Sequence, residues 1–400
     1  MTPTHLFFHH GFVVELLHAV RIFAVSAKYR QGYSHGKADP MIRIKSGKIL
    51  IYRLYDVAHE INLPGVEERL REEARRLKIE RKPFSKALEF ANPPVVFQLK
   101  SIEWESGGRR FPVNVHGKAY DFGVLSIILE IPLQNITLTE LEETAALVSK
   151  SETLREESRT HLNQTISALG SAIVGFNLSR FVEDYTVFFV ETMAPALSAD
   201  DFLLQCDISR LMYGEQKILS SRMKEELLQY RYSYFEDDLV ILNWDNALMI
   251  EPSGSMEIAD ILEFANAQLL ELRYYDDVVD KELGSIHGDI SKKGALSIWK
   301  IKKYERLAAE VMKTIAELMG ITEKIDSALK VTEDVYYAKI YLAALRLFRV
   351  KDWEGSIKKK LDIASNTYDM LYREIANKRT ELLELAIVIL IILEIVIFIR

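Results

Sequence analysis

The residues LLELAIVILIILEIVIFI, at positions 382–399, decide how the rest of this 400-residue chain is interpreted. A helix of that length extends about 27 Å, close to the roughly 30 Å thickness of a hydrocarbon core. The thirteen Leu, Ile, Val and Phe residues after Glu384 favour insertion into lipid by about 4 to 8 kcal/mol. Burial of Glu394 opposes this by about 3 kcal/mol. We therefore expect one C-terminal transmembrane helix over residues 382–399.

The flanking charges predict how this helix is oriented. Lys378 and Arg379 precede the apolar segment, and only Arg400 follows it. This bias places the N-terminal bulk in the cytoplasm and predicts a single-pass protein of the inner (cytoplasmic) membrane. The alternative is a buried core helix or strand of a soluble protein. Glu394 could reach the far interface, become protonated, or pair with a neighbouring subunit.

Composition narrows the class of protein and its partners. The formal net charge of −7 argues against nucleic acid as a direct partner, because bulk electrostatics would repel it. Cys206 is the one cysteine, which excludes an intrachain disulfide and is typical of a small core residue in a reducing compartment. No basic residues precede the apolar patches of residues 6–25, so a cleaved signal peptide is not expected.

The first part of the chain has mixed helix and strand patterns, and the fold class is α+β. Residues 1–40 form an N-terminal extension that includes a first strand at 21–30, and residues 41–253 form an α+β module. Helices are expected at residues 66–82 and 138–169. Strands rich in β-formers are expected at residues 48–55, 95–99, 120–131 and 185–190, with a hairpin of strands 239–242 and 247–250 around Asn243-Trp244-Asp245-Asn246.

The second part, residues 254–381, is predicted to be helical and similar to a coiled coil. Apolar residues recur at steps of three and four, as between Ile258 and Leu283 and between Ile357 and Leu385. Glycines at 284, 288 and 294 predict a break between helices. No Gly or Pro interrupts the last stripe, so one helix is expected from about Asp352 to Ile399. Such stripes need cover from neighbouring helices or from other chains, which predicts a homo-oligomer.

No motif assigns a reaction, so no catalytic, cofactor-binding or metal-binding residue is predicted. Phosphate-binding glycine loops and a nucleophile elbow are absent from the sequence. The spacing of His5, His9 and His10 could suit a metal, but no acidic ligand lies near them. Clusters of charge are interpreted as solvated helix surfaces or helix turns. They comprise the mixed charges of residues 67–82, the acids Asp276, Asp277 and Asp280 near His287, and the lysines 358–360.

Several stretches resemble the "required for meiotic nuclear division" family. They are Asp352-Trp353-Glu354 with the following helix and Glu-interrupted apolar run, Asn246-Ala247-Leu248-Met249-Ile250-Glu251-Pro252, and Tyr120-Asp121-Phe122-Gly123-Val124. The resemblance covers roughly residues 95–400. It implies an α+β domain facing the cytoplasm or matrix, a single membrane helix, self-association and support of translation by tethering ribosomes. Leu385 stands where that family often has a tryptophan, which removes one interfacial anchor.

Two functions follow as hypotheses. The first is a tail-anchored, oligomeric membrane scaffold that presents the α+β module on the cytoplasmic face, with the bilayer, copies of itself and the ribosome or another protein as partners. The alternative is a membrane-associated enzyme with a pocket in the N-terminal module, where Asp121, Glu183 and Asp184 would converge. A pore lined by Glu394 is a third interpretation.

Overall fold

The computed structural model describes residues 42–70, 74–76, 92–215, 217, 219–290, 306, 309, 312–313, 316 and 335–399. The chain divides into two compact units. The first unit comprises Met1–Leu270 and Thr332–Phe348, and the second comprises Glu271–Val331 and Arg349–Arg400. The long helix α8 (Glu257–Ile290) contributes its first part to one unit and its second part to the other.

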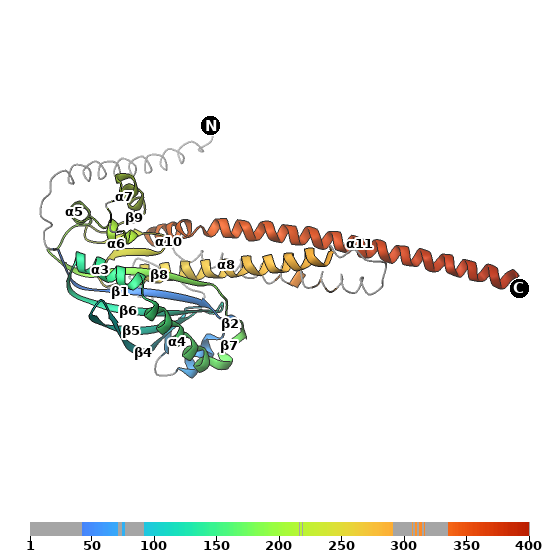
Figure 1. Ribbon diagram of the computed structural model, residues 1–400, viewed down its shortest axis with the longest axis horizontal. Coiled ribbons are helices and arrows are strands. Elements are labelled where there is room, and N and C mark those ends of the chain that lie inside the picture. The colour runs from blue at the N-terminus through green and yellow to red at the C-terminus, as the bar shows by residue number, and fades with distance from the viewer. Residues whose placement is uncertain are drawn as a thin grey trace, which may run out of the picture. The chain divides into compact units, whose positions relative to one another are not determined.

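The first unit is built on a large, mainly antiparallel sheet (Figure 1). Within the described residues, nine strands join in the order β3-β4-β5-β6-β1-β8-β11-β10-β9, and only β8 and β11 pair in parallel. The strands are β1 (Arg43–Asp56), β3 (Ala74–Arg76), β4 (Val95–Ser106), β5 (Arg109–Ala119), β6 (Val124–Thr137), β8 (Val182–Ala194), β9 (Arg231–Tyr232), β10 (Leu239–Leu242) and β11 (Asn246–Ile250). Strands β2 (Ala58–Ile61) and β7 (Ile173–Phe176) form a separate antiparallel pair.

The central strand β1 is buried because both of its neighbours pair with it along nearly its whole length. It pairs with β6 from Arg43 to Asp56 and with β8 from Arg43 to Tyr55. Alternate residues of a strand point to opposite sides, so the sheet has two distinct faces. Ile49 and Ile51 belong to the main core cluster on the first face, and Leu50 and Tyr52 point to the second face.

Six helices of the first unit's described part precede α8, and each of them places apolar residues in the main core cluster on the first face. They are α2 (Leu63–Arg69), α3 (Leu138–Ser149), α4 (Glu152–Leu169), α5 (Ala199–Gln205), α6 (Ser209–Tyr213) and α7 (Ser221–Leu228). Sequence signals fix where they begin. Thr137 and Glu140 form a capping box at the start of α3, and the Ser151 hydroxyl accepts a hydrogen bond from the Leu154 N–H at the start of α4.

The second face of the sheet is covered by the first part of α8 and by α10 (Val335–Leu347). The Lys118 ammonium of β5 lies 2.8 Å from an Asp260 carboxylate oxygen of α8. Tyr185 of β8 contacts Phe348 edge to face, with ring centroids 5.5 Å apart. The sheet is therefore enclosed on both faces.

The second unit contains the second part of α8 and the 50-residue helix α11 (Val350–Ile399), which lie side by side (Figure 1). Asp276 accepts a hydrogen bond from the Ser356 hydroxyl at 2.9 Å, and Asp280 forms an ion pair with Lys360 at 2.7 Å. Because the paired residue numbers increase together, the two helices run in parallel. The predicted stripe positions Leu272, Val279, Leu283, Ile357 and Ala364 are all buried.

The α+β class, the large sheet and the C-terminal helices are confirmed, with corrections in detail. Ala74–Arg76 pairs with β4 as a strand, so a helix through residues 66–82 is wrong. The predicted helix at 138–169 is two helices separated at Lys150 and Ser151. Helix α8 continues past Gly284 and Gly288, where a break was expected. The first strand at 21–30 and the stripe at 301–329 lie outside the residues described well enough to test them.

The last part of α11 was expected to be a transmembrane helix over residues 382–399. Among the residues that the structure describes, no helix combines the length and the apolar character needed to cross a membrane. The helix itself was predicted correctly, since α11 runs without a break through Ile399.

Candidate functional site

The last part of α11 exposes an unusual amount of apolar surface. Thirteen large apolar side chains between Leu383 and Phe398 are exposed, from 50% at Ile391 to 92% at Phe398. They include neighbouring positions from Ile387 through Leu393, so they cover every side of the helix. A contiguous apolar surface of this extent marks an interaction surface in a folded protein.

The acidic residues of α8 and Lys360 of α11 form a partly buried ionic cluster in the second unit. Lys360 lies 2.7 Å from an oxygen of Asp276 and 2.7 Å from an oxygen of Asp280. Burial alone would lower the pKa of Lys360, but the hydrogen bonds and charges of the two carboxylates outweigh burial and raise it. The predicted solvated turn at Asp276 and Asp280 is therefore wrong, because these residues hold two parallel helices together.

The three acids proposed for an enzymatic pocket do not converge. Glu183 and Asp184 are consecutive residues of β8, so their side chains point to opposite faces of the sheet. Asp121 lies in the turn between β5 and β6, where its carboxylate accepts a hydrogen bond from the Asn92 amide at 2.8 Å. The predicted convergence of these three acids on one pocket is therefore wrong.

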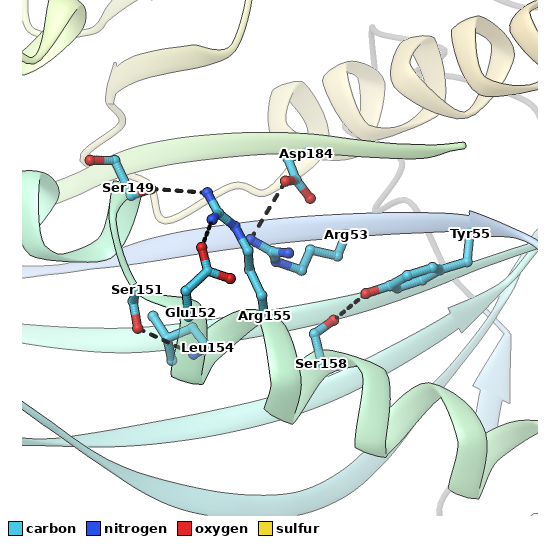
Figure 2. Close-up of polar contacts among 9 residues, drawn as sticks. All are labelled: Arg53, Tyr55, Ser149, Ser151, Glu152, Leu154, Arg155, Ser158 and Asp184. Atoms are coloured by element: carbon cyan, nitrogen blue, oxygen red, sulfur yellow. Dashed lines mark hydrogen bonds and ion pairs between the residues drawn. The ribbon is translucent and has the colours of Figure 1, made fainter. Parts of the chain in front are cut away.

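Asp184 instead belongs to a cluster with two arginines on the first face (Figure 2). Arg53 of β1 lies 3.5 Å from Asp184, and Arg155 of α4 approaches the same group, donating to Glu152 and to the Ser149 carbonyl oxygen. Burial raises the pKa of the Asp184 carboxyl, and the charges of Arg53 and Arg155 oppose this rise. The cluster joins β1 and β8 of the sheet to α4 across the first face.

A pocket of about 410 Å³ lies beside this cluster. Ser149, whose carbonyl oxygen accepts from Arg155, also lines the pocket, and Thr186 and Phe188 follow Asp184 on the same face of β8. The walls come from α3, from α6 with Gly214, and from the turn between β10 and β11. The lining residues are Thr139, Glu142, Glu143, Ala145, Ala146, Val148, Ser149, Thr186, Phe188, Arg210, Leu211, Met212, Tyr213, Gly214, Asn243, Trp244, Asp245 and Asn246.

The turn at one wall of the pocket is fixed by hydrogen bonds to its backbone. The Thr186 N–H donates to the Asp245 carbonyl oxygen at 3.1 Å, and the Tyr185 hydroxyl donates to the Asn246 carbonyl oxygen at 2.9 Å. The Asn243 side chain donates to the Met212 carbonyl oxygen at 2.9 Å and so joins the turn to α6. These hydrogen bonds place the turn beside β8 and α6, and the Trp244 side chain within it is 67% exposed.

Carboxylates dominate the charge of the pocket lining. Glu142, Glu143 and Asp245 carry acidic groups, and Arg210 carries a basic one. Arg109 holds the Glu143 carboxylate at 2.9 Å. Burial raises the pKa of Asp245, while a hydrogen bond from the Asn246 amide opposes the rise. The geometry suits a small ligand that brings hydrogen-bond donors. The alternative hypothesis from the sequence placed a pocket in this module, but none of the three acids named for it lines this one.

Cys206 and the histidines are the remaining candidate residues. Cys206 is buried, as expected for a small core residue. Within the described part of the chain, no group of three or more His, Cys, Asp or Glu residues could hold a metal ion. The metal hypothesis concerned His5, His9 and His10, which lie outside the described residues. The side chain of His287 is not described either.

The comparisons with known proteins bear on the first unit. The family described as "Uncharacterized protein MJ0711, N-terminal domain" matches residues 46–257. The protein MJ0711 of Methanocaldococcus jannaschii is 28% identical over 225 residues, which cover 55% of this chain and 67% of that relative. No solved structure matches the chain.

These matches correct the family assignment made from the sequence. The resemblance to the "required for meiotic nuclear division" family is wrong, because the matching family is that of MJ0711. The short stretches around Tyr120 and Asn246 that suggested it are explained by their local structure. The first is the turn that closes β5 onto β6, and the second is the buried strand β11.

Proposed function

Since the chain belongs to the family of the MJ0711 N-terminal domain, whose description states no activity, we propose a function from its own residues: a membrane-attached, self-associating scaffold. In this proposal the last part of α11 is the attachment segment and the α+β unit is the part available to partners. The link to the translation machinery rested on the family resemblance alone and is not part of the proposal.

The exposed apolar surface of α11 between Leu383 and Phe398 carries the proposal. Transfer of thirteen aliphatic or aromatic side chains from water to lipid is favourable by roughly 4 to 8 kcal/mol. A surface of this extent that remains in water would aggregate, so a cover of lipid or protein is required. Lys378 and Arg379 precede it and are suited to contact anionic lipid headgroups, which supports a lipid surface as the cover.

Self-association is supported by the exposed apolar residues of α11 before the attachment segment. Ile363 and Met370 are exposed at 49% and 52%, although the buried stripe of the same helix faces α8. Residues 363 and 370 are seven apart and so lie on one side of the helix, which is the spacing of a helix-to-helix seam. We expect this side to meet the same side of a second copy.

Flotation with phospholipid vesicles tests the attachment. The full chain is expected to float with neutral phosphatidylcholine vesicles and to stay with them in high salt, because the attachment is hydrophobic rather than ionic. A chain shortened after Arg379 is the control and is expected to remain at the bottom of the gradient. If the full chain also remains there as a dispersed protein, the attachment is refuted.

Light scattering in detergent tests the self-association separately. The full chain is expected to have the mass of an oligomer, and replacing Ile363 and Met370 together by Glu is expected to yield the monomer. A full chain that is monomeric at every concentration would remove self-association from the proposal and leave attachment standing.

A further inference from the structure

We propose that the pocket between α3, α6 and the β10–β11 turn binds a small aromatic amine, with the ammonium group on Asp245 and the ring beside Trp244. This site is independent of membrane attachment, because every residue in it belongs to the first unit. The site also differs from the enzymatic pocket predicted from the sequence, because Asp121, Glu183 and Asp184 do not line it.

The size and the lining of the pocket fit a ligand of this class. A volume of about 410 Å³ lies in the range of small-molecule sites, roughly 300 to 1,000 Å³. Phe188, Leu211 and Met212 form buried apolar walls, so the body of the ligand should be apolar or aromatic. Trp244 is exposed beside them, and an indole face attracts both rings and organic cations.

The charge of the lining selects a cation over an anion. Three carboxylates and one guanidinium line the pocket, and the Glu143 carboxylate is already held by Arg109. Asp245 receives a hydrogen bond from the Asn246 amide at 2.7 Å on one carboxylate oxygen, and no described ion pair neutralises its charge. Asp245 is partly buried, so its carboxylate would attract a cation in the pocket more strongly than a carboxylate in open water would.

Asn246 gives an independent indication that a donor is missing. Its side chain is only 9% exposed, and its amide nitrogen donates to the Met212 carbonyl oxygen at 3.0 Å and to Asp245. Its Oδ1 atom is buried and has no hydrogen-bond partner among the described residues. Buried acceptors are seldom left unmatched in native proteins. An ammonium group, which carries several hydrogens, can serve Asp245 and Asn246 together after a small movement of the turn.

Calorimetric titration of the full chain with three ligands of equal shape and different charge tests the proposal. Tyramine carries an ammonium group, tyrosol a hydroxyl and para-hydroxyphenylacetate a carboxylate at the same place. Tyramine is expected to bind at least about tenfold more tightly than tyrosol, and the anion is expected not to bind. Equal affinity for the three, or no binding of tyramine at millimolar concentration, overturns the proposal.

Two variants separate the site from unspecific uptake. Asp245→Asn keeps the backbone contact to Thr186 and the acceptor for Asn246, and it is expected to weaken tyramine binding at least about tenfold without affecting tyrosol. Glu103→Gln is the control, because this exposed carboxylate of β4 lies outside the pocket lining, and it should leave the affinity unchanged. If both variants weaken binding equally, Asp245 is not the contact and the assignment fails.

Discussion

The two faces of the central sheet are buried to a similar degree but are held together by different interactions. On the first face, the main core cluster joins β-strand residues such as Ile127 to Leu141 of α3 and Leu162 of α4 through apolar contacts. On the second face, α8 places Asp260 and Glu263 against Lys118, and Glu263 is fully buried. Both faces bury apolar side chains, and the second face adds a fully buried ion pair between the sheet and α8.

The difference follows from what each layer must specify. Apolar packing tolerates shifts between a helix and a sheet, because many arrangements bury similar areas. A buried ion pair is satisfied in one register alone, and a helix shifted by one turn would leave Lys118 and Glu263 unpaired at great cost. We infer that the ionic contacts on the second face fix the register of α8, the helix that continues into the second unit.

The largest expected effect tests the second face directly. Replacing Lys118 by Met leaves two carboxylates without their cation and should lower the free energy of unfolding by about 3 to 5 kcal/mol. Burial raises the pKa of Glu263, and without Lys118 it should rise further, so the loss should shrink as the pH falls. Urea unfolding of the full chain at several pH values measures this. The Lys118→Met, Glu263→Met pair should recover most of the loss, and no recovery would contradict the ionic interpretation.

A second test on this side of the sheet uses Asp56 at the end of β1. Burial raises the pKa of Asp56 from 3.8 to about 7, and its Oδ2 atom has no partner among the described residues. The folded state thus holds the proton more tightly than the unfolded chain. The resulting stabilisation is fully present below the unfolded pKa of 3.8 and is lost as the pH rises through about 7.

Asp56→Asn should remove this pH dependence. The variant keeps an acceptor for the Ala58 N–H, so it should be more stable than the natural chain at pH 8, by up to about 4 kcal/mol from the size of the shift. Thermal unfolding of both chains between pH 4 and pH 8 measures the difference. If the unfolding temperatures of the two chains differ by the same amount at every pH in this range, Asp56 is ionised in the folded protein throughout.

The apolar face gives the contrasting prediction. Ile127 of β6 is fully buried in the main core cluster, and Ile127→Ala should cost about 3 kcal/mol through lost contacts and a cavity. Because no titratable group is involved, the loss should be the same from pH 5 to pH 8. Urea unfolding of the variant beside Lys118→Met provides the comparison, and a loss that varies with pH would show that the two faces are not independent.

Sequence patterns predicted the apolar side of this comparison better than the polar side. The β-formers of residues 48–55 and the hairpin around Trp244 were found because their signal is local. The β4–β5 hairpin was missed although Gly107 and Gly108 supply the two positive φ angles, 57° and 73°, that such a tight turn requires. That signal was present in the sequence and could have been used.

The ionic contacts and the pocket could not be predicted in the same way. Asp260 and Glu263 look like solvent-exposed positions on a charged helix, and Lys118 is 142 residues away from Asp260. The pocket joins α3 to a turn about one hundred residues later, and nothing in either segment indicates the other. The break predicted from Gly284 and Gly288 was wrong because the low helix propensity of glycine is a local signal. The packing of the long helix α8 overrides it.

The smallest expected effect concerns a neutral hydrogen bond on the second face. The Tyr341 hydroxyl of α10 donates to the Oε1 atom of Gln268 in α8, and both side chains are buried. Tyr341→Phe leaves that oxygen unmatched and should cost about 1 to 2 kcal/mol. Tyr337→Phe is the matched control, because its Glu257 partner is only partly buried and water can replace the lost donor. Equal losses for the two variants in urea unfolding would mean that burial does not strengthen the polar contacts of this face.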